Sequence, residues 1–505
     1  SATSLPSPAA AAETEGSPEE RIKALEQKLL ILDRKLEIAD EEAAKKKPDM
    51  PVIAAGNKGF SLSSADQAFV LKLRGYLQTD SRWFLNDRDE DINNGDNANT
   101  NAFLLRRARP IIEGTVFKNF DYRFMFDLSR SGDSLEDGYF NFKYFPGAQI
   151  QAGKFKPPVG LERLQSGAEL SFVERGLPTN LVPNRDFGVQ LQGALLGSMA
   201  NYAVGVFNGV PDGQRGSLTD TDDNKDFAGR LFLFPFGNNF NAFQGLGIGV
   251  AGTYGSQDAN YVHVPPSSSG PDNKLVRFTG LPDYISGTQS RFFRYRASST
   301  QPVTTADGIS IQPALLARQT TVADGTRYRI APQAYWYWKR FGLLGEWVRS
   351  SQEVAFDTQS ASERRGTIDN VAWQLVGSVV LTGEDASYKS VTPRTPFDPF
   401  TDAWGAFELA ARYGELDIDD DAFEGTPGSS GNTFTRQQQA ADWAHEWTVG
   451  LNWYPTRNFK LNVDYTHTKF QWGSGSDRLD AAGELSGLKD RDTERAILTR
   501  AQVSF

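Results

Sequence analysis

Short segments in which apolar and polar residues alternate recur from residue 69 to the C-terminus. In residues 446–453, for example, Trp447, Val449, Leu451 and Trp453 share one face and polar or small residues share the other. A period of two is typical of β-strands with one apolar face. Sixteen segments fit this description, and they begin near residues 69, 101, 120, 137, 147, 187, 199, 226, 246, 326, 341, 371, 403, 444, 458 and 494. The pattern predicts an all-β fold.

The last segment, residues 496–505, ends the chain on an aromatic residue, Phe505. Ile497, Ala501 and Val503 lie on the same, mostly apolar face as Phe505. Such a strand can close a transmembrane β-barrel, with lipid outside and water inside, but it also fits a half-buried edge strand of a soluble protein. Alternation alone leaves both folds open.

Composition excludes several other classes of protein. Only 39% of the residues are hydrophobic, and no apolar run is long enough for a membrane-spanning helix. Without cysteine the chain has neither thiolate metal ligands nor a cysteine nucleophile, and three histidines make a histidine-based triad improbable. We therefore expect no cofactor and no enzymatic activity.

The connections between the predicted strands differ in length. Short turns near residues 117–119, 144–147, 234–237 and 454–458 alternate with long polar segments at about 86–100, 156–186, 209–225, 257–325, 383–402, 416–443 and 471–493. Short turns on the periplasmic rim and long loops on the other rim are typical of outer-membrane barrels. This asymmetry favours a sixteen-stranded antiparallel transmembrane β-barrel over residues 69–505 rather than a soluble β protein.

The N-terminus differs from the rest of the chain. Residues 1–16 are mostly Ser, Ala, Pro, Thr and Glu, a composition that predicts disorder. Ser17 is a helix N-cap followed by Pro18 at the first helical position, and Pro48 ends the helix. Heptad a and d positions are apolar throughout: Ile22, Leu25, Leu29, Leu32, Leu36, Ala39 and Ala43.

This heptad spacing predicts a parallel α-helical coiled coil over residues 17–47, joined to the barrel by a linker at 48–68. The alternative is a single amphipathic helix packed against its own domain. The heptad core does not distinguish two strands from three.

Acidic residues concentrate in three of the predicted loops. Stretches 87–96, 212–226 and 415–424 contain 16 acidic and three basic residues, whereas the whole chain has a net charge of −10. The remainder of the chain is therefore slightly basic. The stretch 87–91 could bind Ca²⁺, but it lacks the glycine and terminal glutamate of an EF-hand loop, so we expect a solvated loop.

Basic residues occupy the polar faces of the first two predicted strands. Lys72 and Arg74 lie opposite Leu71 and Leu73, and the second strand carries the pair Arg106 and Arg107. Strict alternation cannot direct both arginines of this pair inward. Either one of them lies at the rim or a β-bulge turns it, and a solvated interfacial arginine cluster is the remaining alternative.

Several short motifs, in order along residues 69–505, resemble the phosphate-selective porins O and P of Gram-negative outer membranes. They are Lys72-Leu73, Leu77-Gln78, Arg106-Arg107, Gly114-Thr115, Phe126-Asp127-Leu128-Ser129, Gly138-Tyr139-Phe140, Gly160-Leu161-Glu162, Glu174-Arg175, Leu381-Thr382-Gly383-Glu384, Gly450-Leu451-Asn452-Trp453-Tyr454 and the terminal strand. The resemblance implies a trimer of sixteen-stranded barrels, with loops folded inward to form an anion-binding constriction. A trimer would make the coiled coil three-stranded.

The resemblance also implies pore-lining residues. Arginine suits bidentate phosphate contacts, and lysine supplies a mobile point charge. The predicted set combines the arginine pair, the basic residue after Gly160-Leu161-Glu162, a pore-loop hydroxyl, a vestibule arginine, two lysines that flank the start of the inward loop, and the two basic residues of the first strand: Arg106, Arg107, Arg163, Ser166, Arg175, Lys154, Lys156, Lys72 and Arg74.

Two positions depart from the family pattern. Asp121 stands where phosphate-selective members have a basic residue, which weakens the case for strict phosphate selectivity. Asn141 replaces an acidic residue and lowers the local negative charge. Together they point to an anion-preferring or broader pore.

The resulting prediction is a trimeric outer-membrane porin for passive diffusion of phosphate-like anions, with its coiled coil in the periplasm. Expected partners are outer-membrane lipid, lipopolysaccharide and, through the N-terminus, peptidoglycan or a periplasmic protein, but no nucleic acid. A weakly selective general porin, or an adhesive barrel using loop 257–325, are the alternatives. A hydrolase built on Asp442, His445 and His467 is conceivable, but such residues are more often solvated at a rim.

Overall fold

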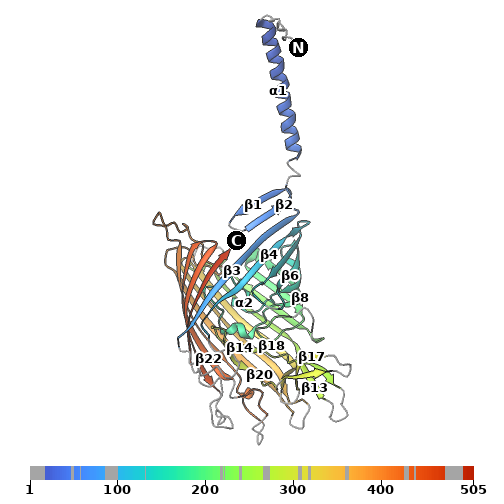
Figure 1. Ribbon diagram of the computed structural model, residues 1–505, viewed down its shortest axis with the longest axis vertical. Coiled ribbons are helices and arrows are strands. Elements are labelled where there is room, and N and C mark those ends of the chain that lie inside the picture. Colours follow the sequence, from blue (N-terminus) through green and yellow to red (C-terminus); the bar gives the residue numbers. More distant parts are fainter. Residues whose placement is uncertain are drawn as a thin grey trace, which may run out of the picture.

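A closed antiparallel β-barrel forms most of the molecule (Figure 1). The computed structural model describes residues 18–46, 51–56, 59–85, 100–130, 132–216, 220, 222–237, 242–264, 273–298, 300–304, 310–316, 320–358, 363–425, 432–436, 440–472 and 493–505. The sixteen barrel strands are β3 (Val70–Phe84), β4 (Ala102–Val116), β5 (Phe120–Phe126), β6 (Leu135–Phe145), β7 (Ala148–Phe155), β8 (Asp186–Leu195), β9 (Ala200–Phe207), β10 (Asp226–Leu233), β11 (Leu246–Asp258), β18 (Thr321–Trp338), β19 (Phe341–Phe356), β20 (Arg364–Val380), β21 (Ala406–Asp417), β22 (Ala441–Thr456), β23 (Phe459–Trp472) and β24 (Thr493–Ser504). The predicted all-β, sixteen-stranded barrel is confirmed.

The last strand closes the barrel. β24 pairs with β3 in a register that runs from Ala496 opposite Phe84 to Ser504 opposite Tyr76. Phe505 extends the seam, because it exchanges two 3.0 Å backbone hydrogen bonds with Gly75. The C-terminal strand is thus the barrel seam rather than a free edge.

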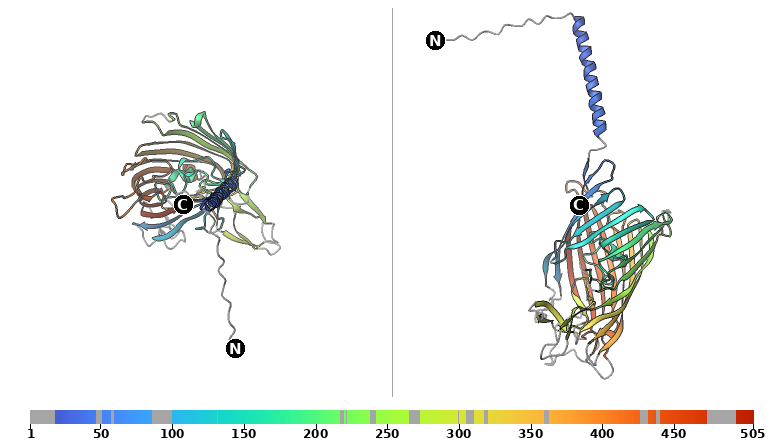
Figure 2. Two further views of the ribbon diagram at one scale, coloured as in Figure 1. Left: turned by 90° about the horizontal axis from the view of Figure 1, so that it is seen from above. Right: turned by 90° about the vertical axis from the view of Figure 1, so that its right-hand side faces the viewer.

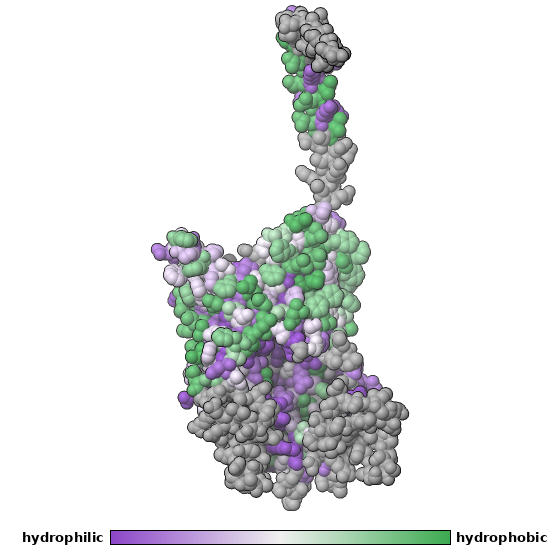
Figure 3. Space-filling model, viewed as in Figure 1, coloured by the Kyte–Doolittle hydropathy of each residue, from purple (hydrophilic) through white to green (hydrophobic). Residues whose placement is uncertain are grey.

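Alternation along the strands has the opposite sense from that of a soluble protein. On β22, Trp447, Val449 and Leu451 are 38 to 43% exposed, whereas Glu446 and Asn452 are almost completely buried. Figure 3 shows hydrophobic residues gathered over the outer wall on the side of helix α1 (Pro18–Lys46). Apolar side chains outside and polar ones inside are the arrangement expected of a barrel in lipid.

Most short turns lie at one rim and most long connections lie at the other. The chain termini of the barrel and the turns 117–119, 146–147, 339–340 and 457–458 share one rim, here called the short-turn rim. The prediction that residues 383–402 belong with the long loops is wrong. They follow β20, which ends at the short-turn rim where the Val380 N–H donates to Arg340 O over 2.8 Å. Length and polarity reveal a long connection, but only the strand direction fixes its rim.

The long segment 257–325 contains regular structure. β12 (Asn260–Val264), β13 (Asn273–Phe278), β16 (Thr300–Thr304) and β17 (Ser310–Leu316) form a four-stranded sheet. Between them, β14 (Asp283–Ile285) and β15 (Arg291–Arg294) form a separate hairpin. Tyr284, Phe292 and Phe293 of this hairpin are at most 1% exposed. The segment therefore includes a buried, inward-packed element within what its composition predicts to be a polar loop.

Helix α1 stands away from the barrel at the short-turn rim (Figure 1). Among the described residues it makes no packing contact with the barrel, and Ile22, Leu25 and Leu29 of its heptad stripe are 55 to 64% exposed. Within the predicted linker, β1 (Val52–Gly56) and β2 (Gly59–Ser63) form a hairpin, and β2 pairs with β3 beyond the end of β24. Neither α1 nor any other described helix combines the length and apolar character needed to cross a membrane. The predicted disordered segment 1–16 lies outside the described residues.

Candidate functional site

The connection between β7 and β8 folds into the barrel. This inward loop, residues 156–185, contains helix α2 (Leu161–Leu164) and the 3-10 helix η3 (Leu177–Leu181). Viewed along the barrel, α2 lies inside the ring of strands (Figure 2). A buried backbone amide must find an acceptor, and wall carboxylates supply several of them. Leu161 N–H and Glu162 N–H donate to Glu346 at 2.7 and 3.3 Å, and Val173 N–H donates to Asp464 at 2.6 Å.

A second insertion enters from the short-turn rim. In the connection after β20, the Tyr388 hydroxyl donates to Leu161 O at 2.6 Å, and the Gln165 side-chain amide donates to Tyr388 O at 2.6 Å. Ala386 N–H also donates to Lys339 O at 2.7 Å, which ties the connection to the neighbouring turn. The inward loop is therefore held both by the wall and by this connection.

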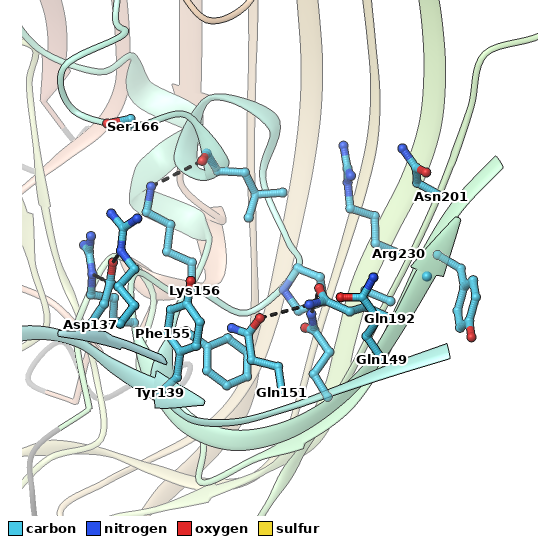
Figure 4. Close-up of a pocket in the computed structure, with 18 of the residues that line it drawn as sticks. Asp137, Tyr139, Gln149, Gln151, Phe155, Lys156, Ser166, Gln192, Asn201 and Arg230 are labelled. Atoms are coloured by element: carbon cyan, nitrogen blue, oxygen red, sulfur yellow. Dashed lines mark hydrogen bonds and ion pairs between the residues drawn. The ribbon is translucent and has the colours of Figure 1, made fainter. Parts of the chain in front are cut away.

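Two cavities lie along the barrel interior. The first, of about 630 Å³, opens toward the short-turn rim and is lined by Lys156, Ser166 and Arg230 among others (Figure 4). The second, of about 680 Å³, lies toward the long-loop rim and is lined by Arg106, Arg107 and other basic residues. Arg185 lines both cavities. Together they define a candidate path through the lumen past the inward loop.

Three cations of the inward loop are held by carbonyl oxygens. Lys156 Nζ donates to Gln165 O at 2.7 Å and to Leu164 O at 3.4 Å, and Arg175 donates to Glu162 O and Gln165 O at 3.2 and 2.8 Å. Arg163 donates to Thr179 O. Within the described part of the chain, none of these three cations has a carboxylate within 4.0 Å.

Burial places these cations in an unfavourable environment. Burial and the charges of Arg175 and Arg185 lower the pKa of Lys156 well below its ordinary value. Burial and the neighbouring arginines likewise lower the pKa of Arg163. Low solvation strengthens the attraction between a cation and any anion that reaches it. Between the two cavities, the inward loop therefore presents three cations that no described carboxylate contacts directly.

The arginine pair on β4 faces the lumen through a bulge. The pairing of β3 with β4 passes from Gln78 opposite Arg107 to Thr79 opposite Leu105, which leaves Arg106 as the extra residue. Both arginines then reach the same carboxylate, Glu174 of the inward loop, at 2.5 and 3.7 Å. The bulge is thus the alternative that the structure adopts.

Glu174 lies at the centre of four arginines. Besides the β4 pair, Arg82 approaches it at 2.9 Å and Arg500 at 3.6 Å. Burial alone would raise the pKa of the Glu174 carboxyl. The attraction of Arg106, Arg107 and Arg500 outweighs burial, so this pKa lies well below its ordinary value. In the sequence, Glu174 stands out only as part of the motif Glu174-Arg175. The excess of basic residues on the first strands is the signal that indicates the need for a compensating carboxylate.

Further arginines line the second cavity, and sequence reasoning does not single them out. Nine arginines and three carboxylates contribute to its lining. Glu136 does not line this cavity, but four of the arginines that do line it pair with Glu136: Arg109 at 3.3 Å, Arg130 at 3.7 Å, Arg185 at 2.8 Å and Arg215. Burial lowers the pKa of Arg215 to about 9 despite this partner. Several arginines per carboxylate leave the cavity positive.

The remaining predicted residues occupy other places. Ser166 lines the first cavity with Lys156, as noted above. Lys154 is 1% exposed and pairs with Asp133 at 2.6 Å, outside the lining of both cavities. Arg74 pairs with Glu113 at 2.7 Å, and Lys72 is exposed, both near the short-turn rim. The structure thus brings the loop cations and the β4 pair to the cavities, but not Lys154, Lys72 or Arg74.

Other features of the sequence fall outside this path. Asp121, the acidic departure from the family pattern, pairs with Lys143 at 2.6 Å and lies opposite Asn141. His445 lies opposite Lys469, and His467 stacks on Trp447 with ring centroids 5.6 Å apart, on the outward faces of β22 and β23. These histidines therefore do not face the lumen. The acidic stretch 87–91 lies outside the described residues.

Comparisons with known proteins agree with this architecture. The family model for phosphate-selective porin O and P matches residues 77–262 and 309–505. Porin O of Pseudomonas aeruginosa is 24% identical over 424 residues, which cover 81% of this chain and 85% of that protein. The match identifies an outer-membrane channel rather than an enzyme, as the sequence predicts.

Two solved structures of low identity superpose over most of the chain. The outer-membrane channel DcaP of Acinetobacter baumannii has a TM-score of 0.47 at 11% identity, covering 87% of this chain and 98% of that one. An anion-selective porin from Comamonas acidovorans has a TM-score of 0.43 at 11% identity, covering 86% of this chain and all of that one. On the strength of the family match, the chain belongs to the phosphate-selective porin O and P family.

Proposed function

We propose that this porin conducts small anions by passive diffusion and prefers phosphate or related phosphorylated anions. The observation that carries the proposal is the set of three loop cations, Lys156, Arg163 and Arg175, held by backbone carbonyls with no carboxylate within 4.0 Å in the described residues. Because a buried charge is unfavourable without a counter-ion, an anion passing the inward loop gains attraction there.

The two cavities lie on either side of these cations, so the attraction acts along the route of a passing anion. The second cavity collects anions among its arginines, and the loop cations lie on the way to Arg185 and the first cavity. Guanidinium groups offer paired N–H donors that match phosphate oxygens. Conduction also requires that no single position hold the ion too tightly. Carbonyl contacts fix the cations without neutralising them, which fits a weak, multi-position path.

Ion selectivity tests the proposal directly. The native chain, reconstituted in planar bilayers, should give zero-current potentials of anion preference in chloride and in phosphate gradients. An Arg163→Ala, Arg175→Ala variant should lose much of this preference. Lys118→Ala, Arg340→Ala removes two exposed cations from the turns of the short-turn rim and should leave the potential unchanged. Cation preference of the native channel contradicts the proposal, and weak selectivity without a phosphate effect supports a general porin.

We also propose that three chains associate and that α1 forms a three-stranded coiled coil in the periplasm, where residues 1–16 can reach peptidoglycan or a periplasmic partner. The exposed stripe of Leu25, Leu29 and Leu32 at 61 to 64% supports association, because an isolated chain leaves it in water. Leu25→Asp, Leu32→Asp should abolish crosslinking between helices in detergent-solubilised protein. Lys23→Asp, Gln27→Asp, away from the stripe, should retain it.

A further inference from the structure

The hairpin formed by β14 and β15, residues 283–294, is a third insertion into the lumen, here called the inner hairpin. It lies within residues 263–308, the stretch that the family model leaves unmatched. Its tip, residues 286–290, reaches two carboxylates of the barrel wall. Gly287 N–H donates to Glu446 at 2.7 Å, and the Ser286 hydroxyl donates to Glu494 at 2.8 Å.

Aromatic packing holds the base of the inner hairpin independently of its tip. Phe292 packs against Phe470 of β23 with ring centroids 5.5 Å apart, and Phe293 stacks on Tyr284 at 5.3 Å. Asn180 of the inward loop adds two hydrogen bonds, because its side chain donates to Ile285 O at 2.9 Å and accepts from Ile285 N–H at 3.0 Å. The base should therefore remain in place when only the tip is altered.

The other side of the tip faces the arginines. Arg82 donates to Thr288 O at 2.9 Å, and Arg106 donates to the Gln289 side chain at 3.2 Å. Ser286 and Gln289 line the second cavity, whereas Glu446 and Glu494 do not and are at most 2% exposed. Neutral groups of the tip thus stand between two wall carboxylates and a cavity lined by arginines.

The tip fits closely against the wall. A Cβ atom added to Gly287 would lie 2.5 Å from both carboxylate oxygens of Glu446, so only glycine allows this approach. Glu446 has other partners as well, namely Arg412 at 3.0 Å and the Thr468 hydroxyl at 3.0 Å. These contacts keep the carboxylate fixed on the wall, so that retraction of the tip would uncover it rather than let it follow.

We propose that the inner hairpin is a charge-masking element that determines selectivity: its tip covers Glu446 and Glu494 and so keeps the long-loop side of the pore selective for anions. The inference rests on the proposed anion conduction. An unmasked carboxylate beside the arginines would attract cations and compete with the transported anion for the guanidinium groups.

Shortening the tip tests this role. In the full chain, residues 286–290 are replaced by two glycines, and zero-current potentials and single-channel conductance are measured in KCl gradients. We expect higher conductance and a several-fold lower anion-to-cation permeability ratio than in the native channel. Adding Glu446→Gln and Glu494→Gln to the shortened tip should restore most of the ratio while leaving the conductance high. The same two substitutions with the native tip should leave the ratio nearly unchanged, whereas a merely steric role of the tip predicts an equal increase in both channels.

A single substitution tests the same role without depending on the folding of the shortened variant. Gly287→Ala displaces the tip from Glu446 and should lower the permeability ratio in the same direction, whereas Gly197→Ala in an exposed turn should not. Heat-modifiable migration of the folded barrel on gels verifies folding of each variant. A native ratio in both Gly287→Ala and the shortened channel overturns the inference, as does a reduced ratio that the two glutamine substitutions fail to restore. Cation preference of the native channel would instead refute the proposed function, and it is measured before any variant.

Discussion

Two regions of the barrel interior carry charged residues but use them differently. On β19 to β23, here called the docking wall, Glu346, Glu446 and Asp464 each accept backbone N–H groups of inserted segments. On β3 and β4, here called the arginine wall, Arg82, Arg106 and Arg107 share one carboxylate, Glu174, and line the second cavity.

Basic residues of the docking wall follow the same rule as its acids. Lys460 donates to Leu170 O at 2.6 Å, and Arg412 donates to Glu174 O at 3.0 Å. Both contacts bind the backbone of the inward loop. Sign of charge therefore does not separate the two walls. The difference is whether the charged group also borders open space: the arginines of the arginine wall line the second cavity, whereas Lys460 and Arg412 line neither cavity. Only a charged group that borders a cavity can serve a passing ion.

The largest effect is expected on the docking wall. Glu346→Leu removes the acceptor for Leu161 N–H and Glu162 N–H, and burying two unpaired amides should destabilise the inward loop by about 2 to 6 kcal/mol. The loop should leave its position, so conductance rises and ion selectivity falls. Single-channel recordings and proteolysis of the inward loop measure this. Glu346→Gln keeps one acceptor oxygen and should therefore lose less loop stability and less ion selectivity. Equal behaviour of the two variants would contradict the docking role of Glu346.

A substitution in the arginine wall should change the affinity of the pore for phosphate rather than the position of the inward loop. Glu174→Gln removes the carboxylate shared by four arginines, so phosphate should bind more tightly and block chloride current at about tenfold lower concentration. Glu113→Gln is the matched control, because Glu113 is shared by Arg74 and Arg123 near the short-turn rim. Unchanged phosphate block in Glu174→Gln would show that these arginines do not meet the transported anion.

Acid should not reproduce the effect of Glu174→Gln. A carboxyl whose folded pKa is lowered stabilises the fold above its unfolded pKa, near 4.3, and this contribution is lost only as the pH falls through the folded pKa. Glu174 therefore stays charged when the pH falls from about 7 to about 4. Over this pH range, phosphate should therefore block chloride current through the native channel more weakly than through Glu174→Gln. The comparison corrects for the change in the charge of phosphate itself.

Sequence reasoning predicts the barrel better than it predicts the path. Alternation over β22 and over the last strand depends on neighbouring residues, so the sequence displays it directly. Glu174 and the inner hairpin gain their roles from partners far along the chain: Arg500 lies 326 positions from Glu174, and Glu494 lies 208 positions from Ser286. Without the paired strands, nothing indicates that these groups meet. Lys154 is the opposite case. The sequence correctly places it at the start of the inward loop, but it does not show that Asp133 neutralises its charge.

A smaller, pH-dependent effect should come from Lys156. Burial and the charges of Arg175 and Arg185 lower its pKa, so it loses its proton as the pH rises through a value below the ordinary 10.4 or so. Anion preference should then fall on the alkaline side. Lys156→Arg keeps a charge that does not titrate in this range and should flatten the profile. A native profile that is already flat would mean that Lys156 does not contribute charge to the path.

The smallest effect is expected for Lys72 and Arg74, which the sequence places on the pore-facing side of β3 but the structure leaves near the short-turn rim. Lys72 is exposed, and Arg74 is paired with Glu113 at 2.7 Å. In about 0.15 M salt the screening length is about 8 Å, so an exposed charge scarcely affects an ion near the inward loop. Lys72→Ala should leave the zero-current potential unchanged at this salt concentration and shift it slightly at about 0.01 M. A large shift at physiological salt would mean that the rim, and not only the arginine wall, selects the ion.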